Sequence, residues 1–164
     1  MEHIFYRGKP LPLTIGYHSL KKSRLEILSD RAQATLCYDL SSRQQKEQLK
    51  TLTEQLYRRS TKNIIEETLM LLRHFAPRPV QGIRYKKMRS RWGSASGKNN
   101  LNFNIDLAKL PLPVQQYIAI HEYCHLFEMN HSSKFWAKVA QFDPLYKEHR
   151  RELRRLEKSW TPRT

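Results

Sequence analysis

Residues 111–136 read PLPVQQYIAIHEYCHLFEMNHSSKFW, and the fold of the C-terminal half is decided in this stretch. From about 113 to 129 it is apolar nearly all round, which predicts a central, buried helix with Pro113 at its first position. His121, Glu122 and His125 form an H-E-x-x-H motif within it. Residues four apart share one helix face, so both imidazoles can bind one metal ion, while Glu122 can reach a water molecule on it.

The surroundings of the motif favour a metal over two decorative histidines. Apolar and aromatic residues lie on both sides of it, and imidazoles and a carboxylate are costly in such a helix unless something satisfies them. Zinc would do so, and it would also polarise a carbonyl and lower the pKa of a water molecule to about 7. We therefore predict His121 and His125 as metal ligands and Glu122 as the catalytic base.

A third ligand is expected at His131, six residues after His125. A straight helix would carry His131 about 9 Å further along its axis, so the helix must break, and Asn130 is suited to a left-handed turn there. The spacing is that of three-histidine zinc proteases. Two alternatives stay open: His131 only caps the next helix, or Glu148 or Glu152 supplies the third ligand.

The rest of the chain predicts one α+β domain over residues 1–164. Three short segments, 13–19, 24–30 and 34–40, read as antiparallel strands of a meander within an N-terminal unit of residues 1–40. Leucines and isoleucines at helical spacing predict a long helix over 41–76, capped by Ser41 or Ser42 and ended by Pro77 and Pro79.

The catalytic core is expected over residues 80–160. Strands are predicted at 83–88 and 100–105, and the second alternates apolar residues with asparagines, as a half-buried strand does. A short helix follows at 133–142, and a last amphipathic helix follows Pro144. The inner stripe of this last helix is predicted to consist of Leu145, Leu153, Leu156 and Trp160.

Charge is the strongest signal in the composition. Thirty Lys+Arg against fifteen Asp+Glu give a net charge of +15 and a pI near 10.1. No carboxylate lies between Glu67 and Asp106, and the candidate contacts for nucleic acid or an acidic substrate in that stretch are Arg84, Lys86, Lys87, Arg89, Arg91 and Lys98. The basic run from 147 to 158 contains glutamates, so we interpret it as a solvated helix face.

Several protein classes are excluded by composition. The apolar runs are shorter than a membrane span needs, and the first residues lack the features of a signal peptide. Two cysteines make no disulfide framework, so Cys37 and Cys124 are expected to be small buried thiols. We expect a cytoplasmic protein without a membrane partner.

The segments RWGSAS at 91–96, NIDL at 104–107 and the stretch 111–136 together resemble the YgjP-like family of small zinc metallopeptidases, which is similar to the SprT-like and WLM peptidases. The resemblance covers about Ile83 to Leu153 and, less specifically, the N-terminal part. It implies a zincin-like fold, one zinc ion and hydrolysis of peptide bonds. His121, His125 and His131 fall on the metal-binding positions and Glu122 on the catalytic one, whereas Ala95 replaces a cysteine often found there.

The resemblance also suggests how substrate is held. In zincins an edge strand above the metal binds an extended peptide, and RWGS or NLNFN would supply that edge. Asn102 and Asn104 are more simply read as outer-face polar residues than as peptide anchors. Trp92 is expected in the core, and Phe135 and Trp136 are expected to pack on the broken helix end and hold His131. Tyr146 is a candidate oxyanion stabiliser.

Three functions follow from these observations. The first is a zinc-dependent peptidase acting on polypeptides. The second is a nucleic-acid-associated form that cuts DNA-bound proteins, since SprT-like and WLM relatives are associated with repair of DNA–protein crosslinks. The third is a nonenzymatic nucleic-acid-binding protein with a structural zinc. Three histidines without a nearby cysteine ligand favour an open, catalytic site over a structural one.

Overall fold

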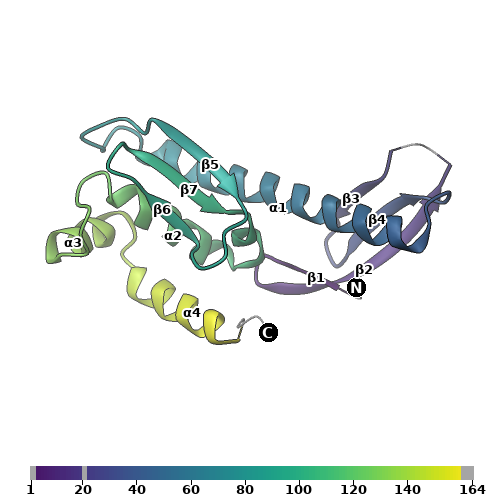
Figure 1. Ribbon diagram of the computed structural model, residues 1–164. Helices are drawn as coiled ribbons and strands as arrows, with labels where there is room; N and C mark the ends of the chain where they lie inside the picture. Colours follow the sequence, from purple (N-terminus) through teal and green to yellow (C-terminus); the bar gives the residue numbers. More distant parts are fainter. Residues whose placement is uncertain (1–2, 20–21, 160–164) are drawn as a thin grey trace.

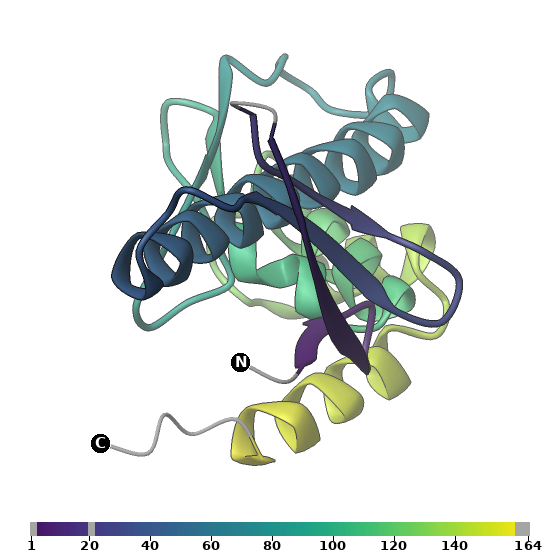
Figure 2. The same cartoon turned by 90° about the vertical axis from the view of Figure 1, so that its right-hand side faces the viewer.

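The computed structural model describes residues 3–19 and 22–159. Helix α1 (Ser42–Leu72) runs through the molecule and joins two regions, as Figures 1 and 2 show. One end carries a four-stranded sheet, and the other carries a three-stranded sheet with the remaining helices. The fold is α+β, as predicted. No described helix is long and apolar enough to cross a membrane.

The N-terminal sheet has the strand order β1-β2-β4-β3. Its strands are β1 (His3–Tyr6), β2 (Lys9–His18), β3 (Arg24–Ile27) and β4 (Ala32–Cys37). The β1–β2 and β3–β4 pairs are antiparallel, but β2 and β4 run parallel. The predicted meander is therefore wrong. β4 returns between β2 and β3, which places its alternating Ala32, Ala34 and Leu36 on the buried face against α1.

Helix α1 begins as expected, with Ser41 as its cap. The Ser41 hydroxyl accepts from the Gln44 backbone N–H, and the Gln44 side chain accepts from the Ser41 N–H at 2.9 Å, which is a capping box. The helix ends at Leu72 rather than at residue 76, and a turn precedes Pro77. Its first half packs on the N-terminal sheet and its second half on the opposite region.

The second sheet has the order β5-β7-β6. Strand β7 (Asn100–Asn104) pairs in parallel with β5 (Gly82–Lys86) and antiparallel with β6 (Gly93–Ala95). The expectation that NLNFN supplies a peptide-binding edge is wrong, because this segment is the central strand. Strand β6, part of the RWGS segment, lies at the edge of the sheet.

The asparagines of β7 have structural partners. Asn102 donates to the Ser94 hydroxyl at 3.2 Å. Asn104 is buried, donates to the Met88 and Arg91 carbonyls, and accepts from the backbone N–H of Asp106. This last bond caps the short 3-10 helix η1 (Ile105–Lys109).

A hairpin turn from the N-terminal sheet docks just ahead of the next helix. The backbone N–H groups of Arg7 and Gly8 donate to the Ala108 and Lys109 carbonyls at 2.9 and 2.7 Å. Gly8 has a φ of +83°, and a Cβ there would lie 2.8 Å from Cγ of Pro111. Glycine meets both demands, because it tolerates positive φ and has no side chain.

Three further helices follow within the described residues: α2 (Leu112–Cys124), α3 (Ser133–Phe142) and α4 (Tyr146–Ser159). α3 matches its predicted bounds. Leu153 and Leu156 of α4 pack on the core as expected, but Leu145 precedes the helix and is 54% exposed. Trp160, the remaining member of the predicted stripe, lies outside the described residues.

Candidate metal centre

The last turn of α2 presents His121 and Glu122. The helix is central as predicted, and Glu122 is only 7% exposed. It ends at Cys124, with His125 as its cap residue in right-handed helical conformation. The predicted extension to residue 129 is wrong, because the backbone tightens beyond Cys124. The N–H groups of Leu126 and Phe127 donate to the carbonyls three residues earlier, both at 3.0 Å.

This tight turn brings His131 back without a left-handed residue. Asn130 does not have a positive φ, so the expectation of a left-handed turn there is wrong. The His125 ring instead fastens the turn, since its Nδ1 lies 3.0 Å from the Glu128 carbonyl. A proton on Nδ1 makes this bond and leaves Nε2 of His125 for a ligand. The cap of α3 is Ser132, which accepts from the Phe135 N–H at 3.3 Å, so His131 is not that cap.

The three predicted histidines form one cluster. His121, His125 and His131 each offer a ring nitrogen, and the three nitrogens lie within 4.8 Å of one another. The Nε2 atoms of His121 and His131 are 3.0 Å apart. Glu148 and Glu152 are not part of this group, and Glu152 instead accepts two bonds from Arg155 at 2.8 and 2.6 Å.

The donor set fits a divalent metal ion. Burial, helped by the two other histidines and Arg150, lowers the pKa of His121 to about 3, so its ring stays neutral. Burial also lowers the pKa of His125. Neutral imidazoles keep the lone pair that a metal needs. Nδ1 of His121 is buried without a hydrogen-bond partner. Three imidazole nitrogens and no fourth ligand among the described residues match an open site rather than a closed structural one.

Aromatic rings from α3 fix the imidazoles. Phe135 is fully buried, stacks on His125 with ring centroids 4.6 Å apart, and meets His131 edge-on at 4.8 Å. Trp136 stacks on His131, with ring centroids 5.7 Å apart. The expectation that these two residues pack the broken helix end and hold His131 is confirmed.

Glu122 lies against the edge strand β6. A Cβ on Gly93 would be 2.6 Å from Cγ and 2.7 Å from Oε1 of Glu122, so only glycine leaves room for this carboxylate. Burial raises the pKa of Glu122 to about 7, and Arg91 opposes the shift. Gly93 was not predicted as a site residue, although the RWGS segment that contains it was predicted as a possible peptide-binding edge.

The remaining predicted site residues are spread around the centre. All six cations of the stretch 84–98 are exposed, and Lys87 pairs with Glu54 at 3.1 Å. Tyr146 stacks on Trp136 at 5.6 Å, so it lies one ring removed from the histidines, and its role as an oxyanion stabiliser stays a prediction. Cys124 is fully buried as expected, whereas Cys37 is half-buried. Trp92 packs on the core and donates to Glu157 at 2.9 Å.

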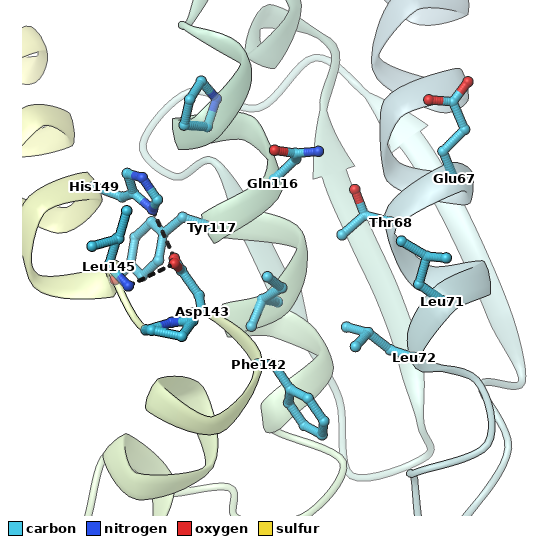
Figure 3. Close-up of a pocket in the computed structure, with 13 residues that line it drawn as sticks. Glu67, Thr68, Leu71, Leu72, Gln116, Tyr117, Phe142, Asp143, Leu145 and His149 are labelled. Atoms are coloured by element: carbon cyan, nitrogen blue, oxygen red, sulfur yellow. Dashed lines mark hydrogen bonds and ion pairs between the residues drawn. The ribbon is translucent and has the colours of Figure 1, made fainter.

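A pocket lies between α1, α2 and the start of α4 (Figure 3). His149 and Asp143 meet in its wall at 2.8 Å, and Asp143 also accepts from the Leu145 N–H. His149 is thereby engaged with Asp143 and is not one of the three clustered histidines.

Comparison with known protein families shows to which family the chain belongs. A family model described as YgjP-like, metallopeptidase domain, matches residues 1–156. The chain belongs to the YgjP-like metallopeptidase family. It is a peptidase by family membership, and a polypeptide substrate follows. A comparison with curated proteins found no match.

Two solved structures are similar to this YgjP-like chain. One is the metallopeptidase zymogen abylysin of Pyrococcus abyssi, with 24% identity and a TM-score of 0.47 over 59% of this chain and 95% of that one. The other is the metallopeptidase zymogen jannalysin of Methanocaldococcus jannaschii, with 25% identity and a TM-score of 0.47 over 60% and 89%.

Proposed function

We propose that this YgjP-like protein is a zinc-dependent peptidase in which His121, His125 and His131 hold one zinc ion and Glu122 is the general base. The observation that carries the proposal is the cluster of three imidazole nitrogens within 4.8 Å, beside a buried carboxylate. Nitrogen ligands with a neighbouring carboxylate base favour zinc among the common divalent metals.

The chain's own groups divide the chemistry of hydrolysis. Zinc, when bound, supplies Lewis acidity that polarises the scissile carbonyl and makes a water molecule easier to deprotonate. Glu122 takes that proton and later returns it to the leaving amine. Gly93 and the wall of β6 fix the Glu122 side chain, and Phe135 and Trp136 fix the rings of the ligands.

Replacing Glu122 by glutamine tests the proposal. The variant should keep stoichiometric zinc, measured by elemental mass spectrometry, because the ligands are unchanged. Hydrolysis of a fluorogenic peptide should fall by roughly 10²–10⁴-fold, the usual contribution of a general base. Glu128→Gln is the matched control: it makes the same chemical change, and the Glu128 contact with His125 uses the backbone carbonyl, which the variant retains. Undiminished hydrolysis by Glu122→Gln would refute the assignment, and loss of the fold would favour a structural zinc.

The exposed cations of residues 84–98 favour a second candidate, a protease that acts on proteins bound to nucleic acid. Arg91 is near enough to Glu122 to oppose the rise of its pKa, so this basic stretch reaches the candidate centre. DNA should then accelerate cleavage of a DNA-bound protein more than that of the same protein free in solution. The acceleration should fall steeply with salt, as phosphate contacts require.

A further inference from the structure

Helix α4 separates its charges, although its sequence mixes them. Lys147, Arg150, Arg151 and Arg154 follow helical spacing and lie together along one face. The glutamates of the helix lie outside the groove that this face lines. The basic run is therefore not simply the solvated helix face that the sequence predicts, because its cations form an organised surface.

These four cations, together with Arg155 and Lys158, line a groove of about 780 Å³, which we call the α4 groove. Trp136 and Tyr146 also line it, and no carboxylate does. Among the described residues, no carboxylate oxygen lies within 4.0 Å of a nitrogen of the four cations. Arg155 is paired with Glu152 at 2.6 Å, but the four cations of this face are not compensated in this way and repel one another, so the groove favours an anionic occupant.

The α4 groove adjoins the candidate metal centre. The Arg150 guanidinium lies 4.4 Å from the centroid of Trp136, and Trp136 stacks on His131 with centroids 5.7 Å apart. Arg150 is therefore within about 10 Å of the His131 ring, which an extended polypeptide spans with about three residues. A side chain in the groove would belong to a residue near the bond that is cleaved.

The chemistry of the groove matches carboxylates better than nucleobases. Bases bind to protein aromatic rings by stacking on an open face. Trp136 is already stacked on His131 and on Tyr146, with interplanar angles of 24° and 19°, and Arg150 lies over it. The guanidinium groups of Arg151 and Arg154, by contrast, are exposed and can bind carboxylates in bidentate fashion.

We propose that the α4 groove is a substrate-selecting subsite that binds aspartate or glutamate side chains of the polypeptide close to the scissile bond. This inference rests on the proposed peptidase function. It makes Arg151 and Arg154 specificity-determining residues rather than catalytic ones.

Peptide binding is measured first, with a variant that does not hydrolyse the peptide. The zinc-loaded Glu122→Gln protein is titrated against two labelled peptides of equal length, one with a run of glutamates and the other with glutamines in their place. Fluorescence anisotropy should show at least tenfold tighter binding of the glutamate peptide. Arg151→Glu with Arg154→Glu should abolish this difference.

The control is Arg43→Glu with Lys46→Glu, on exposed residues at the start of α1, which changes the net charge equally. It should retain the preference, and circular dichroism checks that both double variants are folded. Equal affinity for the two peptides, or equal losses in both double variants, would overturn the proposal. Tighter binding of an oligonucleotide of the same charge, lost in Arg151→Glu with Arg154→Glu, would also overturn it and make the groove a nucleic-acid site.

Turnover separates this proposal from the one on which it rests. With Glu122 intact, kcat/KM should favour the glutamate peptide by a similar factor, and the groove variant should lose only that factor. A preference in binding without hydrolysis of either peptide would refute the peptidase mechanism while supporting the selectivity of the groove.

Discussion

The two ends of α1 bury polar groups in different ways. At the N-terminal end the buried hydroxyls are hydrogen-bonded: Thr53 donates to the Leu49 carbonyl at 2.7 Å, and Ser60 meets the Tyr6 hydroxyl at 3.0 Å. At the other end the Thr68 hydroxyl is bonded in the same way, but Nδ1 of His121 is buried without a partner, and Glu122 is buried with its pKa raised. Buried polar groups are normally satisfied, so the contrast separates a region built for stability from one that holds reactive groups.

The largest effect should come from the reactive end. His131→Ala removes one of three ligands, so zinc binding and hydrolysis should both fall to background, because two imidazoles alone hold zinc weakly. His74→Ala, on an exposed histidine outside the cluster, is the control and should change neither. Zinc titration with a chromophoric chelator measures the loss. Full zinc affinity in His131→Ala would contradict the three-histidine site.

At the stabilising end, Leu36→Ala should affect folding alone. Leu36 is 1% exposed in the N-terminal core, and such a truncation costs about 2–5 kcal/mol of unfolding free energy. Urea denaturation would show this change. Below the transition, the zinc stoichiometry and kcat of the folded fraction should match the unaltered protein. A proportional loss of kcat would show that the two ends are not separate in function.

Gly93→Ala brings a smaller effect, at the contact between β6 and Glu122. The added methyl group must displace the carboxylate, so kcat should fall by roughly 10–100-fold, or about 1.4–2.7 kcal/mol, while zinc stays bound. Gly97→Ala is the matched control, since no atom lies within 4 Å of the Cβ it adds. Equal activities of the two variants would show that the position of Glu122 is not set by Gly93.

The smallest effect concerns the helix that joins the two ends. Ser41→Ala removes the cap of α1 and should lower the unfolding free energy by about 1 kcal/mol. Ser41→Thr retains a hydroxyl and should recover most of it. Thermal denaturation compares the two variants, and no change in Ser41→Ala would mean that the cap contributes nothing to stability.

The same contrast explains how much the sequence could predict. Ligand spacing and apolar periodicity are local properties, so the H-E-x-x-H helix, the cap at Ser41 and the bounds of α3 were predictable from neighbouring residues. The position of His131 near the other two histidines was correctly predicted from a break in the helix, but the predicted left-handed turn at Asn130 was wrong. Asparagine is a recognisable signal for a left-handed turn. The 3-10 turn closed by the His125 ring requires no particular residue type, so the sequence does not reveal it.

Other features depend on contacts between distant segments. The parallel pairing of β2 with β4 and the central place of β7 follow from which strands meet, and each strand's own pattern fits either arrangement. The approach of Gly93 to Glu122 joins two elements that are about thirty residues apart. The basic face of α4 was visible in the spacing of its cations, but the included glutamates concealed it until the helix was seen in place.

The docked turn at Arg7 and Gly8 gives the molecule a second brace. Besides this turn, α1 and the packing of Ile105 and Ala108 of η1 on the N-terminal core join the sheet to the region of the metal centre. The turn is hydrogen-bonded to the chain just before Pro111, where α2 starts, and so adds a further connection beside α1. A segment far from the histidines in sequence therefore braces the start of the helix that carries His121 and His125.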